Sequence, residues 1–187
     1  MIADEDLVRD KATKAINHYL DVLQGKDGAT LYELAKALDG LVAIYHQIPD
    51  VEPDTSEGPE APRIEERSLI DAAAAAFPDL QLFALVDPEM GPDQEVIMSM
   101  AMGNLAEIAA DLTEVLWFFE NASHNDAVWE FRFGYQTHWG RHLHEVRTYL
   151  HALAAWRTTE MGSFSEGRLS SVAKPKADRP AHAILPN

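Results

Sequence analysis

The amino-acid sequence predicts an all-α fold: a single-domain bundle of four to five helices with a long C-terminal antiparallel helix hairpin. Apolar residues recur at spacings of three and four over most of the chain, which is typical of amphipathic helices. No segment alternates apolar and polar residues for long enough to predict a sheet. The length of 187 residues is sufficient for one domain with its own core.

Two amphipathic helices are predicted in the first quarter of the chain. The first runs from about Asp4 to Gln24, and the glycines that follow end it. The second begins near Thr30, whose hydroxyl can cap the helix together with Glu33 three residues later. Pro49 ends the second helix, because proline cannot continue one.

Residues 49–66 are predicted to form an acidic, proline-rich loop. They contain four prolines, and seven acidic side chains against a single arginine. This composition offers too little apolar surface to offset the entropy of ordering the chain, so we expect a mobile, solvated linker. An acidic docking tract is the alternative interpretation of the same segment.

A short third helix is predicted from about Glu65 to Phe77, where a run of five alanines favours helix formation. Pro78 closes it. Residues 79–86 are compatible with an irregular helical turn or a short strand, and we expect the helical turn. Residues 87–92 contain Asp-Pro and Gly-Pro pairs, which indicate turns.

Two long helices complete the predicted bundle, from about Asp93 to Asn121 and from about Ser123 to Trp156. Ser123 and Asp126 indicate a cap at the start of the last helix. Because the connection is so short, we expect the two helices to run antiparallel as a hairpin. The bundle is predicted to span residues 1–157, and residues 158–187 to form a flexible tail.

Composition excludes several kinds of protein. The chain has 15 basic and 31 acidic residues, a net charge of −16, which argues against nucleic-acid binding and against anionic membranes. It has no cysteine, so disulfides, thiolate metal sites and cysteine nucleophiles are excluded. The start of the sequence lacks signal-peptide features, and polar residues interrupt the most apolar stretch, residues 96–119. We therefore expect a cytoplasmic protein without membrane spans.

Polar residues interrupt the apolar faces of both long helices. On the first, Asn104 and Asp111 lie within the apolar arc and Glu107 lies at its edge. On the second, His142 lies within the arc and His138 one turn earlier at its margin. Burying an ionised carboxylate without a partner costs several kcal/mol. We therefore predict that the two carboxylates meet the two imidazoles across the helix pair.

Two histidines four residues apart on one helix face can share a metal ion, and facing carboxylates can complete its coordination shell. The sequence lacks the Glu-x-x-His pattern of di-iron bundles and the His-Glu-x-x-His pattern of metalloproteases. We therefore expect an imidazole–carboxylate cluster that stabilises the helix pair without metal, and metal binding is the alternative. The predicted ligands for zinc, iron or manganese are Glu107, Asp111, His138 and His142. The wider predicted ligand-binding set adds Asn104, Tyr45 and Trp139.

The segment His138-Trp139-Gly140-Arg141-His142-Leu143, followed by Leu150-His151-Ala152-Leu153, resembles a bacterial family, the domain of unknown function 5063. In that family an acidic helix, here residues 105–112, precedes a helix with a His-Trp-Gly-x-His-like segment. The resemblance covers about Leu7 to Leu153 and leaves out the tail. It implies a helical bundle and no particular activity, and it selects the same polar positions as the helical spacing.

Three functions fit these observations. The first, which we expect, is a non-catalytic domain that binds a protein or a small molecule and needs no cofactor, because the sequence has no nucleophile motif and no phosphate-binding loop. The second is a metal-dependent enzyme or metal sensor that uses the four predicted ligands. The third is a structural module in which an apolar patch pairs two copies as a homodimer.

Overall fold

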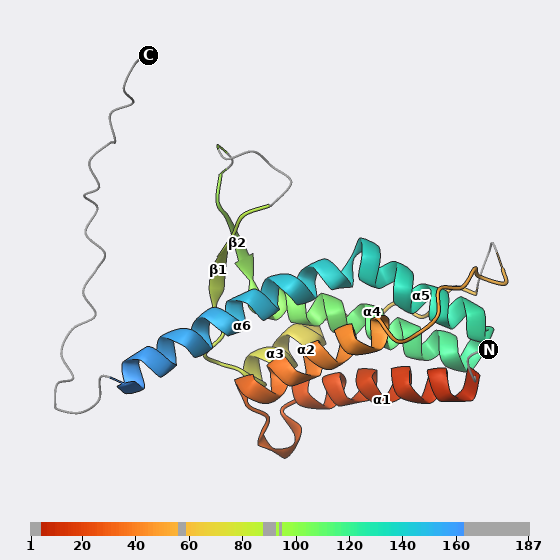
Figure 1. Cartoon of the computed structure of the whole chain (residues 1–187), viewed down its shortest axis with the longest axis horizontal. Coiled ribbons are helices and arrows are strands. Elements are labelled where there is room, and N and C mark those ends of the chain that lie inside the picture. Colours follow the sequence, from red (N-terminus) through yellow and green to blue (C-terminus); the bar gives the residue numbers. More distant parts are fainter. Residues whose placement is uncertain (1–4, 56–58, 88–92, 94, 163–187) are drawn as a thin grey trace, which may run out of the picture.

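The computed structural model describes residues 5–55, 59–87, 93 and 95–162 of the chain. Over these residues the protein is mostly helical, with one small two-stranded sheet in addition. In Figure 1 the helices lie side by side in an elongated bundle, and the sheet stands out from one side of it. The elements in chain order are α1 (Glu5–Leu23), the 3₁₀-helix η1 (Lys26–Gly28), α2 (Leu31–Tyr45), α3 (Glu66–Ala76), β1 (Leu82–Leu85), β2 (Ile97–Met100), α4 (Ala101–Asn121), α5 (His124–Thr137) and α6 (Trp139–Gly162).

Helices α1 and α2 begin and end within a few residues of the predicted positions. The Thr30 hydroxyl accepts a hydrogen bond from the backbone N–H of Glu33 at 3.2 Å, which confirms the predicted cap of α2. Between the helices, Gly25 has a φ of 71°, a left-handed conformation that favours glycine. A Cβ on Gly25 would also lie 3.1 Å from the Cβ of Ala76, so this turn packs closely against the end of α3.

The first part of the proline-rich loop contacts α5. The backbone N–H of Thr55 donates to the buried carboxylate of Asp126 at 3.1 Å. The guanidinium of Arg132 donates to Asp50 at 3.2 Å, and also to two backbone carbonyls at the end of α2 and just after it. Residues 49–55 therefore have specific partners, and the mobility expected of the whole loop stays a prediction.

A short antiparallel ribbon, β1 paired with β2, stands where the sequence predicted a helical turn at residues 79–86 and the start of a helix at Asp93. The prediction was wrong because four-residue apolar runs are too short for helical and extended spacing to be told apart. Pairing across the two segments then satisfies their backbone groups. Phe83 of β1 stacks on Tyr149 of α6, with ring centroids 4.8 Å apart. Helix α4 consequently begins at Ala101.

The single helix predicted over residues 123–156 is two helices, α5 and α6, which meet at His138. His138 has φ −143° and ψ −85°, outside the helical region, although its N–H still donates to the Gly134 carbonyl at 2.8 Å. The break accompanies burial of the Trp139 indole beside Gly134, where a Cβ would lie 2.8 Å from the indole Cδ1. One continuous helix was a wrong prediction because this packing is a tertiary effect, and the apolar spacing continues through the break.

Helix α4 lies at the centre of the bundle and packs against α1, α3, α5 and α6. Its connection to α5 has the predicted cap, since the Ser123 hydroxyl accepts a hydrogen bond from the N–H of Asp126 at 3.0 Å. Near the start of α4, the backbone carbonyl of Leu105 accepts a hydrogen bond at 2.8 Å from the fully buried phenol of Tyr19 on α1. α4 is therefore held from several directions, which positions the polar residues along it.

The C-terminal helix α6 extends to Gly162. The remainder of the predicted tail, residues 163–187, lies outside the described residues. Within the part of the chain that the structure describes, no helix has both the length and the apolar character needed to cross a membrane.

Replacing Tyr19 by Phe is expected to lower the free energy of unfolding by about 1 kcal/mol, because a buried hydrogen bond is lost while ring packing is kept. Unfolding in guanidinium chloride, followed by circular dichroism, measures this loss. Tyr32→Phe is the matched control, since Tyr32 on α2 is exposed, and it should change stability by less than about 0.5 kcal/mol. Equal losses in both variants would contradict the role given to the Tyr19–Leu105 bond.

Candidate metal centre

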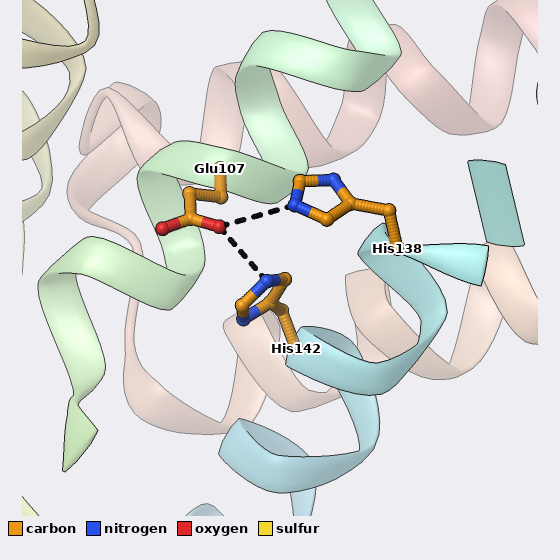
Figure 2. Close-up of side chains that lie close together, drawn as sticks. All are labelled: Glu107, His138 and His142. Atoms are coloured by element: carbon orange, nitrogen blue, oxygen red, sulfur yellow. Dashed lines mark ion pairs between the residues drawn. The ribbon is translucent and has the colours of Figure 1, made fainter.

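Two acidic side chains of α4 face two imidazoles at the junction of α5 and α6. Glu107 and Asp111 lie one turn apart on α4, His138 lies at the helix break, and His142 lies one turn into α6. Figure 2 shows both imidazole rings turned towards the Glu107 carboxylate from the opposite helix. The structure therefore brings together the four residues predicted as metal ligands.

The contacts form a chain of pairs. Glu107 Oε2 lies 2.8 Å from Nε2 of His142 and 3.4 Å from Nε2 of His138 (Figure 2). His138 uses its other ring nitrogen towards Asp111, with Nδ1 2.7 Å from Oδ2. Asp111 thus contacts the far edge of the His138 ring, while Glu107 lies between the two imidazoles.

Three of the four residues form a group that a metal ion could join. One ligand atom from each of Glu107, His138 and His142 lies within 4.8 Å of the others. The side chains of Glu107 and His138 are 38% and 49% exposed, whereas that of His142 is 19% exposed. The group therefore lies at the edge of the bundle with one side open to solvent.

The local structure at the α5–α6 junction depends on Gly140. A Cβ on Gly140 would lie 2.0 Å from the carbonyl oxygen of Tyr135, well below any non-bonded contact distance. Next to it, Trp139 is fully buried and its ring packs on Phe131 with centroids 5.1 Å apart. This close approach sets the angle between the helices and hence where both imidazoles stand opposite α4.

The charge on His138 is stabilised by its neighbours. The hydrogen bond to Asp111 is the largest cause that raises the pKa of His138, burial acts in the opposite direction, and the negative charges of Asp111 and Glu107 add to the increase. The folded protein therefore holds a proton on this ring more strongly than the unfolded chain does.

Two further carboxylates extend the acidic surface beyond Asp111. Burial raises the pKa of Glu114 on α4, and the charge of Asp111 raises it further. Burial also raises the pKa of Glu130 on α5, to which the charges of Glu114 and Asp111 add. Sequence analysis missed both residues. Glu114 could have been found, since it lies seven residues after Glu107 on the same helix face, whereas Glu130 joins the group only through tertiary packing.

Replacing Glu130 by Gln is expected to raise the melting temperature at pH 7. The raised pKa means that the folded state prefers the protonated carboxyl, so ionised Glu130 destabilises the fold above that pKa. The gain should shrink as the pH falls and vanish below about pH 4, where the carboxyl is protonated in the unfolded chain as well. Differential scanning calorimetry from acidic to neutral pH measures it. Glu120→Gln, exposed at the end of α4, is the control, and the same pH-dependent gain there would contradict this role of Glu130.

The three residues of the wider predicted set lie outside the cluster. Asn104 is buried and donates through Nδ2 to Glu145 at 3.1 Å. The Tyr45 hydroxyl accepts a hydrogen bond from Gln136 at 2.9 Å, and its place in a ligand-binding set stays a prediction. Trp139 is a core residue. Helical spacing assigns a residue to a face, but it does not say which neighbour that face meets.

The comparisons with known proteins agree with this fold. A family model described as "Domain of unknown function (DUF5063)" matches residues 11–156. The chain belongs to this family. The match confirms the resemblance to this family, and it covers nearly the predicted span. It also includes all of the residues that form the candidate centre.

A solved structure shares the architecture. The chain is similar to the crystal structure of protein BF1032 from Bacteroides fragilis, with a TM-score of 0.58 and 17% identity over 78% of this chain and 89% of that one. At this identity the likeness shows the fold alone. No curated protein matches the chain.

Proposed function

We propose that the protein is a non-catalytic metal-binding module, which binds one divalent transition-metal ion through Glu107, His138 and His142. The observation that supports this most directly is the convergence of one carboxylate oxygen and two imidazole nitrogens within 4.8 Å. Two imidazoles and a carboxylate are ligands that suit zinc or iron(II), and manganese fits less well because it prefers oxygen ligands. In this proposal Asp111 supports a ligand and is not itself one.

Two of the three distances between donor atoms are close to those around a bound ion. Ligand atoms about 2.1 Å from a tetrahedral ion lie about 3.4 Å from each other. The Glu107–His138 distance is 3.4 Å, and the Glu107–His142 distance of 2.8 Å is shorter by a few tenths of an ångström. Rotation of the partly exposed Glu107 side chain can lengthen the shorter contact. The ligand nitrogens of His138 and His142 lie within 4.8 Å of each other, so they would have to approach by at most about 1.4 Å.

Asp111 orients His138 for this role. An ionised carboxylate only accepts hydrogen bonds, so at 2.7 Å the Nδ1 of His138 carries a proton. In the neutral ring the lone pair is then on Nε2, the atom that faces Glu107. Such a carboxylate behind a histidine ligand typically contributes 10–100-fold to metal affinity. His142 has no equivalent support, because its buried Nδ1 has no hydrogen-bond partner among the described residues.

The arrangement of the helices also supports a binding site between them. Along α4, Asn104 contacts Glu145, Glu107 contacts His142, and Asp111 contacts His138. The residues of α4 therefore meet those of α5 and α6 in reverse order, and we propose that these elements are the two arms of the predicted antiparallel hairpin.

The charge around the site also favours a cation. The carboxylates of Glu114 and Glu130 lie near Asp111, in a protein of net charge −16. We propose that the protein functions in the cytoplasm.

A second candidate is that the cluster only stabilises the helix pair, within a domain that binds a protein or small molecule elsewhere. The distances of 2.7 and 2.8 Å favour it, because they are those of direct pairing. The two candidates differ in what happens when a metal ion is added, since a purely stabilising cluster has no metal-dependent increase in stability.

Elemental analysis of protein purified without a polyhistidine tag tests the proposal. After removal of metal with a chelator and dialysis against zinc, iron(II) or manganese(II), we expect about one ion per chain for zinc or iron. Titration calorimetry with zinc should show a single site. Retention of less than about a tenth of an ion per chain for every metal would refute metal binding and leave the second candidate.

A further inference from the structure

The ribbon formed by β1 and β2 has an outer face whose residues are all exposed, and an inner face that is buried at Phe83, partly buried at Leu85 and Ser99, and exposed at Ile97. Its register pairs Leu82 with Met100 and Ala84 with Met98, and these four residues point to the same side. Continuing the register pairs Val86 with Val96 on that side. The residues of this outer face are Leu82, Ala84, Val86, Val96, Met98 and Met100, and each of them is exposed.

The inner face of the ribbon is the one that packs on the bundle. Phe83 is buried and stacks on Tyr149 of α6, and Leu85 packs against the core. The ribbon therefore already has a helix beneath it, and the outer face is not required for the fold. In Figure 1 the ribbon projects from the bundle, and the large residues of the outer face remain about half exposed, although Ala84 and Val86 also line a cavity with Thr148 and Ala152 of α6.

The outer face is apolar and also uncharged. Neither residues 80–86 nor residues 96–102 contain an acidic, basic or histidine side chain, in a chain of which 25% is charged. Exposed strands of monomeric proteins usually carry charges or proline that prevent association, and this ribbon has neither in its strands. A contiguous apolar patch of this kind marks an interaction surface.

We propose that two copies of the chain associate through their outer faces, across a two-fold axis. The five large outer-face residues are 48–59% exposed. Residues of this size present roughly 200 Å² each when fully exposed, so the pair of faces can bury about 1,000 Å² in total, the lower limit for a specific interface. A face without charge can meet its own copy without placing like charges in contact, whereas it offers a charged partner nothing to pair with.

The net charge of the chain predicts how salt acts on this dimer. Two copies of charge −16 repel each other at low ionic strength, and salt screens that repulsion while leaving the apolar contact intact. Dimerisation should therefore strengthen between about 50 and 500 mM NaCl. A basic protein partner held by charge would show the opposite dependence.

Sedimentation velocity of the full chain, with chelator present so that metal cannot link the copies, tests the proposal. Between roughly 5 and 500 µM protein the average mass should rise from one chain towards two, and more steeply at high salt. Leu82→Lys and Met98→Lys place a charge on the outer face, and each should weaken association by at least about tenfold, with unchanged circular dichroism. Leu7→Lys, at an equally exposed leucine on α1, is the matched control and should leave association unchanged.

Each result decides the proposal. A chain that stays monomeric at every concentration and salt level overturns it. So does a dimer that the double variant L82K/M98K leaves intact, one that Leu7→Lys disrupts equally, or one that salt weakens. This inference is independent of the metal site, since the outer-face residues contribute none of the predicted ligands.

Discussion

Gly140→Ala is expected to destabilise the protein by about 3 kcal/mol, the largest stability effect that we predict for a single added methyl group. The new Cβ would lie 2.0 Å from the carbonyl oxygen of Tyr135 and 2.9 Å from its carbonyl carbon. Both are backbone atoms, so no side-chain rotation relieves the clash and the α5–α6 junction must open. For a chain of 187 residues this loss corresponds to a fall in melting temperature of about 6–12 °C.

Gly40→Ala is the matched control for this substitution. Gly40 lies inside α2, and a Cβ there meets nothing within 4 Å. Alanine has a higher helix propensity than glycine, so this variant should gain up to about 1 kcal/mol. Thermal unfolding of both variants measures the contrast. If Gly140→Ala melts at the temperature of the unmodified protein, the close junction described above is incorrect.

His142→Ala is expected to abolish zinc binding at the proposed centre, with a loss in affinity of more than about 100-fold. His142 supplies one of three donor atoms, and a site with two ligands holds zinc poorly. In the unmodified protein, zinc at 100 times its dissociation constant should stabilise the fold by about 2.7 kcal/mol, or about 5–11 °C in melting temperature. The variant should show no such shift. Titration calorimetry and thermal unfolding with and without zinc measure both effects.

Two further variants separate ligation from general destabilisation. Asp111→Asn should keep one ion per chain but weaken zinc binding by about 10–100-fold, because the amide orients the His138 ring less strongly. His151→Ala, at an exposed histidine later in α6, is the control and should bind zinc as the unmodified protein does. If His151→Ala loses zinc as completely as His142→Ala, the ion is bound through surface histidines and the centre is disproved.

Much of the candidate site could be predicted, because the spacing of its residues along the sequence places them on one face of each helix. Glu107 and Asp111 are four residues apart, as are His138 and His142, and an unpaired carboxylate on an apolar face requires a partner. The histidines are the available partners on the adjacent helix. Helical spacing could not predict that Glu130 lies near this group, because its neighbours on α4, Glu114 and Asp111, are distant from it in sequence.

The sequence by itself determined the helical class, the first two helices with the Thr30 cap, and the Ser123 cap between the long helices. These are local properties, decided by side chains within one or two turns of each other. Its two errors in secondary structure arise where contacts between distant segments override a local pattern or decide an ambiguous one. The break at His138 and the β1–β2 ribbon depend on contacts between distant segments, Trp139 in the core and Phe83 against Tyr149. Tertiary structure alone decided these features, because packing free energy there exceeds the small local preference for a continuous helix.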